Sequence, residues 1–170
     1  VLEELLGPWT RPGRITVIPS AIDLARYPVR TQANGPPTVT LGWIGTKSTL
    51  RYLAAIRPAL ERLGERHPGL RLKIIADDFF DCDGLQVIKV PWSLEGEVEA
   101  LRSVDIGLGP VEDHPWAWGK CGVKVLQYLA VGLPVVCSPI GANREIVQDG
   151  VEGFWAKTVE EWVEQVDRLI

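Results

Sequence analysis

Two lysines and a glutamine follow one another at intervals of four and three residues in WGKCGVKVLQYLAVGLPVV, residues 118–136. In a helix over residues 120–131, Lys120, Lys124 and Gln127 would fall within a strip about 60° wide. Apolar residues fill the remaining surface, so the helix is predicted to be buried, with this strip facing a cleft or a ligand. Two neighbouring ammonium groups repel each other unless an anion lies between them, and a diphosphate would serve. The alternative is that both amines reach solvent while their stems pack against the protein.

A second candidate anion site lies in LGWIGTKSTLRYL, residues 41–53. Gly45 would let the backbone approach a ligand, and the N–H groups of residues 46–49 open the next helix. Ser48 or Thr49 could equally cap that helix without any ligand. The stretch lacks the Lys-Ser/Thr ending of a P-loop and the three glycines of a dinucleotide fingerprint, so neither an NTPase nor a nicotinamide enzyme is supported.

Carboxylates are concentrated in two loops that are expected to follow strands. Glu112 and Asp113 lie in GPVEDHPWAWGK, residues 109–120, which is rich in aromatic and titratable side chains for a connecting loop. In SPIGANREIVQDGVEGF, residues 138–154, Gly141 precedes Asn143, a candidate N-cap, and Glu145 falls in the first helical turn. That glutamate suits either a ligand contact or the helix dipole alone.

Short apolar runs alternate with helical patterns along the chain, which predicts a parallel α/β sheet covered on both faces. Ligands of such sheets bind at the carboxyl ends of the strands. Pro58 is expected to kink the first long helix or to shift its start. The expected strands are residues 14–19, 38–45, 70–76, 85–91, 104–109, 134–138 and 153–156, and the expected helices are residues 48–65, 95–103, 120–131, 143–148 and 158–170.

Composition excludes several classes of protein. The 170 residues suit one domain, and a net charge of −4 offers no basic face for nucleic acid. No apolar run is long enough for a membrane span. With two histidines, and with acidic spacing in ADDFFDCDG that misses the EF-hand order, no metal site is predicted. The three widely spaced cysteines indicate reduced thiols that fill the core of a cytoplasmic protein, and peripheral attachment to the cytoplasmic face of a membrane is left open.

The order of several motifs resembles the group 1 (family 4) glycosyltransferases, and in particular the C-terminal, nucleotide-sugar-binding half of these two-domain GT-B enzymes. The resemblance implies a single Rossmann-like, doubly wound parallel sheet, one half of a GT-B fold. Residues 1–37 would be an N-terminal strand and linker, and residues 38–170 the nucleotide-sugar-binding domain. The motifs that carry the resemblance are VIPSAIDLARYPVR, LGWIGTKSTLRYL, VPW, DIGLGP, GKCGVKVLQYLAVGLPVVCSPIGANREIVQDGVEGFWA and EEWVEQVDRL.

The family's two signature glutamates, separated by seven residues, align with Gly119 and Gln127, so both acids are missing. The resemblance implies that Gln127 binds the ribose as a neutral partner, and Gln127→Glu is expected to be tolerated. Glu112 and Asp113 are the candidates for supplying the missing carboxylate, and no catalytic residue is assigned.

The arginine of the family's phosphate site aligns with Thr46, and its lysine partner falls near Arg51. We therefore expect Lys47, Lys120 and Lys124 to neutralise the donor diphosphate, together with Gly45 and Thr46. The resemblance also implies two further contacts. Val90, Pro91 and Trp92 would meet the base, and Gly141, Ala142 and Glu145 would lie near the sugar or the phosphates.

The implied function is retaining transfer of a sugar from a nucleotide-diphosphate donor to an unknown acceptor, with no cofactor and no metal. Because the sequence contains no methionine, even at position 1, we expect a piece of a longer chain whose acceptor domain precedes Val1. Alone, this piece would bind donor weakly and transfer nothing. Two alternatives remain open: a GT-B sugar-nucleotide epimerase or hydrolase, and a degenerate, non-catalytic nucleotide-sugar-binding module.

Overall fold

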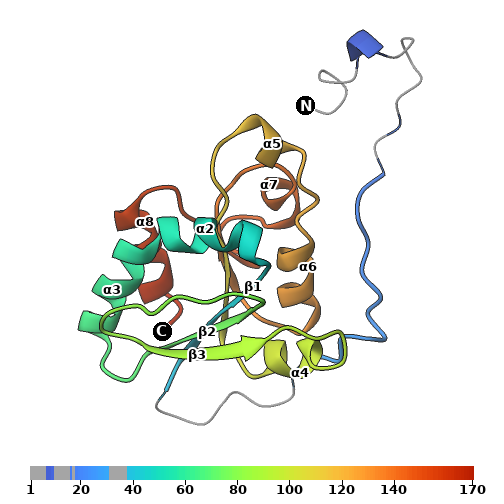
Figure 1. Ribbon diagram of the computed structural model, residues 1–170. Helices are drawn as coiled ribbons and strands as arrows, with labels where there is room; N and C mark the ends of the chain where they lie inside the picture. The colour runs from blue at the N-terminus through green and yellow to red at the C-terminus, as the bar shows by residue number, and fades with distance from the viewer. Residues whose placement is uncertain (1–6, 10–15, 17, 31–37) are drawn as a thin grey trace.

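The computed structural model of the chain describes residues 7–9, 16, 18–30 and 38–170. Six parallel strands form one sheet in the order β3-β2-β1-β4-β5-β6, of which Figure 1 labels β1, β2 and β3. The strands are β1 (Thr40–Ile44), β2 (Arg71–Ala76), β3 (Gln86–Pro91), β4 (Ile106–Gly109), β5 (Val135–Cys137) and β6 (Gly153–Trp155). The helices are η1 (Gly7–Trp9), α2 (Lys47–Ala55), α3 (Arg57–Arg66), α4 (Glu97–Arg102), α5 (Pro115–Trp118), α6 (Val123–Ala130), α7 (Asn143–Ile146) and α8 (Val159–Asp167).

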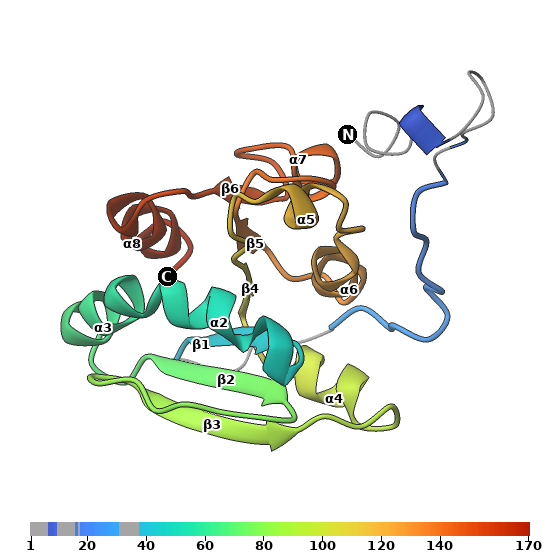
Figure 2. The ribbon, with the colours of Figure 1, turned by 45° about the horizontal axis from the view of Figure 1, so that its top comes forward.

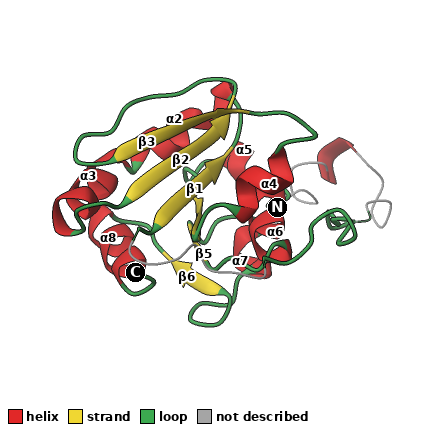
Figure 3. Cartoon of the chain, turned by 90° about the horizontal axis from the view of Figure 1, so that it is seen from below, coloured by secondary structure: helices red, strands yellow, loops and turns green. Residues whose placement is uncertain are grey.

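Helices cover both faces of the sheet (Figures 2 and 3). One apolar core joins α2, α3 and α8 to one face, and the other joins α4 and α6 to the opposite face. Neighbouring strand residues alternate between the two cores, as the pleat of a doubly covered strand requires. The predicted Rossmann-like, doubly wound α/β fold is confirmed. The strand order reverses between β1 and β4, where such sheets open a crevice at their carboxyl ends.

Several predicted elements differ from the structure at their ends, and three of these differences bear on the description of the fold. The helix expected over residues 48–65 is divided into α2 and α3, because Pro58 occupies the first turn of a new helix. The helix expected from residue 120 begins only at Val123, after Gly122 adopts a left-handed conformation with φ of 65°. The strand expected over residues 14–19 lies partly outside the described residues, and positions 16, 18 and 19 are not in a strand.

The contact between Gly107 and Tyr128 fixes the position of α6 on the sheet. A Cβ atom at Gly107 would lie 2.5 Å from the Tyr128 ring, so the ring packs there only because the position is glycine. The Tyr128 hydroxyl accepts a hydrogen bond from Ile44 N (3.0 Å) and donates one to Leu108 O (3.1 Å). Since Lys124 lies one turn before Tyr128, this anchor directs Lys124 to the carboxyl ends of β1 and β4.

The described part of the segment before the sheet packs on the α4 and α6 side. Tyr27 is buried in that core, and the Arg30 guanidinium forms an ion pair with Asp105 (2.6 Å). The Arg30 N–H donates to Val131 O (3.0 Å) at the end of α6. Residues 27–30 therefore contribute to this layer, and the linker expected over residues 31–37 lies outside the described residues.

Candidate functional site

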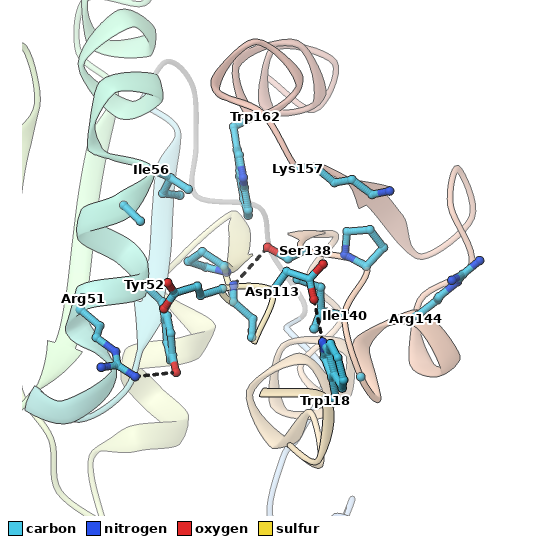
Figure 4. A pocket seen from close by; sticks show the side chains of 16 residues that line it. Arg51, Tyr52, Ile56, Asp113, Trp118, Ser138, Ile140, Arg144, Lys157 and Trp162 are labelled. Atoms are coloured by element: carbon cyan, nitrogen blue, oxygen red, sulfur yellow. Dashed lines mark hydrogen bonds between the residues drawn. The ribbon is translucent and has the colours of Figure 1, made fainter. Parts of the chain in front are cut away.

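Two adjoining cavities open where β1, β4 and β5 end. The smaller, of about 270 Å³, is bordered by the loop before α6 and by the start of that helix. The larger, of about 940 Å³, lies between α2, the loops after β4 and β5, and α8 (Figure 4). Tyr52 and Ile140 border both cavities, as do Pro110 and Val111. The site therefore lies at the crevice that the strand order predicts.

The amine of Lys124 lies at the carboxyl end of β1. Its Nζ is 4.3 Å from the centroid of the buried Trp43 ring and donates a hydrogen bond to Thr49 Oγ1 at 3.2 Å. A Cβ atom at Gly45 would lie 2.6 Å from this Nζ, so glycine leaves the space that the amine occupies. The structure thus places this amine at the strand ends. Its contact with a ligand remains a prediction.

The surroundings of Lys124 destabilise the protonated, positively charged form of its amine. Burial, and after it the neighbouring positive charge of Lys120, lower the pKa of its amine to about 7. No carboxylate forms an ion pair with either lysine within residues 7–9, 16, 18–30 and 38–170. The pair is a half-buried cationic site whose charge an anion would balance.

Lys120 precedes α6 rather than lying on it, so the predicted helical strip does not include it. Its amine nevertheless borders the same small cavity as Lys124 and lies 4.3 Å from the centroid of the Tyr52 ring. The Tyr52 hydroxyl accepts a hydrogen bond from Arg51 Nη2 at 3.2 Å, and this bond lowers the pKa of the phenol. Aromatic rings therefore hold both amines.

The start of α2 is not open to an anion in this structure. The Gly45 N–H donates to Ile75 O (3.0 Å), and the Thr46 N–H donates to Thr49 Oγ1 (3.1 Å). The Lys47 N–H donates to Asp77 Oδ1 (2.5 Å), which places a carboxylate where the expected phosphate would bind. The exposed Lys47 amine pairs with Asp78 at 3.3 Å. The structure therefore does not bring Lys47 together with Lys120 and Lys124.

Gln127 belongs to a buried chain of hydrogen bonds. Its Nε2 donates to the Tyr27 hydroxyl (3.0 Å), which donates to Glu97 Oε1 (2.6 Å). The other oxygen of Glu97 accepts from Trp92 Nε1 at 2.8 Å. Glu97, Tyr27 and Gln127 are all buried. The chain joins the residue expected at the ribose to a residue expected at the base, through two side chains that the sequence analysis did not identify.

The three residues expected at the base end β3 and begin the following loop. Val90 and Pro91 pair with Ile75 and Ala76 of β2. The Trp92 N–H donates to Ala76 O (3.0 Å), and its side chain is 47% exposed. Part of the indole is therefore free to contact another molecule while its nitrogen is held by Glu97.

The substitution Gln127→Glu, expected from the family pattern to be tolerated, should instead destabilise the fold. A carboxylate at position 127 cannot donate a hydrogen bond to the Tyr27 hydroxyl. Only that hydroxyl would separate it from the buried Glu97 carboxylate. We expect a loss of about 1–3 kcal/mol in the free energy of unfolding at pH 8. Repulsion raises the pKa of the new acid, so the deficit relative to wild type should shrink at pH 5, as urea unfolding at both values would measure. Equal stability of the variant and wild type at pH 8 would contradict this.

The two candidate carboxylates border the larger cavity, and Gly141 borders it too. Asp113 Oδ1 accepts from Trp118 Nε1 at 2.6 Å (Figure 4), and Glu112 lies close enough to Arg51 to influence its pKa. Neither acid borders the small cavity that holds the lysines. The structure therefore places these two acids at the larger cavity and not at the small cavity that the paired lysines border.

Only some of the residues expected to contact the donor from the loop after β5 border the two cavities. At Gly141, φ is 56°, and a Cβ atom there would lie 2.9 Å from Trp118 O, so the turn requires glycine. Ala142 caps α7, the role that the sequence suggested for Asn143, whose buried amide instead donates to Ser138 O (3.2 Å). Glu145 is exposed and borders neither cavity.

Sequence reasoning missed the aromatic side chains that support the site and misassigned one thiol. The sequence patterns predict only that Trp43 lies in a strand and that Tyr52 lies in a helix. No local pattern marks either, because the lysines that they contact lie about 70–80 positions further along the chain. Cys82 and Cys137 are buried as expected, but Cys121 is exposed and borders the small cavity, so it does not fill the core.

Among the described residues, no group of three or more histidine, cysteine, aspartate or glutamate side chains could hold a metal ion. The same part of the chain contains no helix with the length and apolar character needed to cross a bilayer.

Comparison with known proteins identifies the family. Residues 38–170 match the sequence profile of the family described as Glycosyl transferases group 1. The chain belongs to the group 1 glycosyltransferases. It is 24% identical over 183 residues to D-inositol 3-phosphate glycosyltransferase of Actinosynnema mirum, an alignment that covers 93% of this chain and 44% of the relative. The chain thus spans less than half the length of that curated relative.

Solved structures of group 1 and related glycosyltransferases share this fold. The C-terminal domain of a group 1 family protein (LpcC) from Francisella tularensis superposes with a TM-score of 0.58 at 15% identity, covering 89% of this chain and 83% of that one. The lipopolysaccharide outer core galactosyltransferase WaaB, in its apo form, superposes with a TM-score of 0.67 at 16% identity, covering 99% of this chain and 50% of that one. This group 1 chain therefore has the fold of the C-terminal half of a GT-B glycosyltransferase.

Proposed function

We propose that this chain holds the nucleotide-diphosphate sugar donor of a retaining glycosyltransferase. The observation that carries the proposal is the pair Lys120 and Lys124, which border a small cavity at the switch point of the sheet. Both amines rest on aromatic rings. A diphosphate between them would balance their charge and, as a leaving group, would be stabilised by it.

The proposed donor extends in both directions from these lysines. On one side lies the hydrogen-bonded chain from Gln127 to Trp92, which suits a nucleoside because it combines a buried amide with a partly exposed indole. On the other side lies the larger cavity with Glu112, Asp113 and Gly141, which has room for the sugar. The donor would thus run from β3 across the end of β1 to the loops after β4 and β5.

The exposed thiol of Cys121 offers a direct test, because it borders the small cavity. Burial raises the pKa of the other two thiols, to about 11 for Cys82 and about 12 for Cys137, so a disulfide reagent such as DTNB should modify Cys121 first. We expect saturating pyrophosphate, UDP, GDP or ADP to slow this fast reaction at least fivefold.

The Cys121→Ser variant should lack the fast phase, which would assign that phase to this thiol. Sodium chloride at matched ionic strength should slow the reaction much less, because it only screens the attraction between the lysines and the anionic reagent, and this comparison separates binding from screening. A rate unaltered by pyrophosphate and by all three nucleotides at millimolar concentration would contradict the proposal and favour a module that no longer binds nucleotide sugars.

A further inference from the structure

Tyr52 lies at the boundary between the two cavities. Of the four residues that border both, it alone has a polar side chain, because the others are Pro110, Val111 and Ile140. The side chain comes from α2 and is only 6% exposed, so its position is fixed by packing. In Figure 4 its hydroxyl lies beside Arg51, and a dashed line marks the hydrogen bond between them.

The environment of Tyr52 makes its hydroxyl a strong hydrogen-bond donor. Arg51 Nη2 donates to the oxygen at 3.2 Å, and the Lys120 amine lies over the ring. Both cations favour negative charge on the oxygen, and the pKa of the phenol is lowered, first by the bond from Arg51. Within the described part of the chain no acceptor is found for the hydroxyl's own proton, which leaves it for a ligand oxygen.

We infer that the Tyr52 hydroxyl donates a hydrogen bond to the phosphate that carries the sugar of the bound donor. This inference rests on the proposed function. If Lys120 and Lys124 hold the diphosphate in the small cavity and the sugar occupies the larger one, the bond that joins them crosses the boundary beside Tyr52. The lysines supply charge without direction, whereas a phenol in a fixed position selects one oxygen.

The test compares two hydroxyl deletions, using whichever of UDP, GDP or ADP wild type binds most tightly. Calorimetry should show that Tyr52→Phe binds this nucleotide roughly tenfold more weakly, the effect of losing one hydrogen bond to a charged group. Phosphorus NMR should show that the variant shifts the bound β-phosphorus resonance more than the α-phosphorus resonance. The matched control is Ser103→Ala at the end of α4, whose hydroxyl donates to Ala100 O (2.7 Å) and borders neither cavity, and whose loss should leave affinity and both resonances unchanged.

A labelled wild type supplies a second measurement that does not depend on the variant's folding. The chain has three tyrosines, so 3-fluorotyrosine gives three fluorine resonances, and spectra of Tyr27→Phe and Tyr128→Phe assign the Tyr52 resonance by elimination. That resonance should move with the nucleoside diphosphate and with pyrophosphate, but not with the nucleoside alone.

The outcomes separate this inference from the proposal on which it rests. If wild type binds the nucleotide but the Tyr52→Phe affinity lies within twofold of it and the β-phosphorus resonance is unmoved, the inference is overturned and donor binding stands. The inference is also overturned if the Tyr52 fluorine resonance shifts with neither the nucleoside diphosphate nor pyrophosphate. If wild type binds neither pyrophosphate nor any of the three nucleotides, the proposed function falls, and the inference falls with it.

Discussion

Replacing Lys124 with methionine should weaken binding of a nucleoside diphosphate roughly 10- to 100-fold, the usual effect of removing a charge-assisted contact worth about 1.5–3 kcal/mol. Methionine keeps most of the length of the stem but lacks the Nζ atom that contacts Trp43, so the apolar packing of the stem is retained while the charge is removed. Isothermal titration calorimetry of both proteins with UDP, GDP and ADP measures the change.

The same substitution should stabilise the unliganded fold. The folded-state pKa of Lys124, about 7, lies below its ordinary value of 10.5, so folding opposes protonation of this amine. Between these two pH values the unfolded chain binds the extra proton and wild-type stability rises with pH, whereas below pH 7 the destabilisation is present in full. Lys124→Met should therefore gain most over wild type near pH 6, which thermal unfolding across pH 6–9 would measure.

A matched control is Lys73→Met, which removes another partly buried lysine with a lowered pKa. Its amine donates to Ser103 Oγ at 2.5 Å and borders neither cavity. This variant should leave nucleotide affinity unchanged. Equal loss of affinity in both variants would assign the effect to net charge rather than to the cavity.

Donor binding should weaken as pH rises through neutrality. The diphosphate requires a charged Lys124, so an amine with a pKa of about 7 must take up a proton when the ligand binds above that pH. Affinity for a nucleotide-diphosphate sugar should fall roughly 25-fold between pH 6.5 and pH 8.5, because the protonated fraction of the free amine falls by that factor. The diphosphate of such a donor has no titrating proton of its own in this range.

Calorimetry in buffers of different ionisation enthalpy measures the proton uptake directly. At pH 8 the apparent binding enthalpy of wild type should vary with the buffer, with close to one proton taken up for each donor bound. Lys124→Met should show neither the uptake nor the decline in affinity. Affinity that is constant from pH 6.5 to pH 8.5 in wild type would show that Lys124 does not contact the diphosphate.

Local sequence pattern was sufficient to predict the sheet and the general place of the site. Runs such as LKIIA alternate between two cores, which only a doubly covered sheet allows, and parallel strands bring their following loops to one edge. Lys124 reaches that edge because Tyr128, one turn later, packs on Gly107. The helix start was predicted less well, since Gly122 in a left-handed conformation begins α6 three residues late.

Contacts distant in sequence were not predictable. Tyr27 and Gln127 are 100 positions apart, and no sequence feature near either residue indicates that the Tyr27 hydroxyl will accept a hydrogen bond from the Gln127 amide. The carboxylate of Asp77, which closes the start of α2, comes from the loop after another strand. In both cases the tertiary fold brings the partner into contact. The periodicity of a helix can therefore identify a polar residue on its buried face, but it cannot identify the group that will form a hydrogen bond with that residue.

The bond between Tyr27 and Gln127 also couples two parts of the molecule mechanically. Tyr27 is hydrogen-bonded to Gln127 of α6 and to Glu97 of α4. The backbone N–H of Arg30 forms a further hydrogen bond with Val131 O at the end of α6. A force that displaced this segment would act on both helices at once and would pull on the Gln127 amide, which donates to Tyr27. Such a displacement would reach α6, and with it Lys124, without passing through any strand.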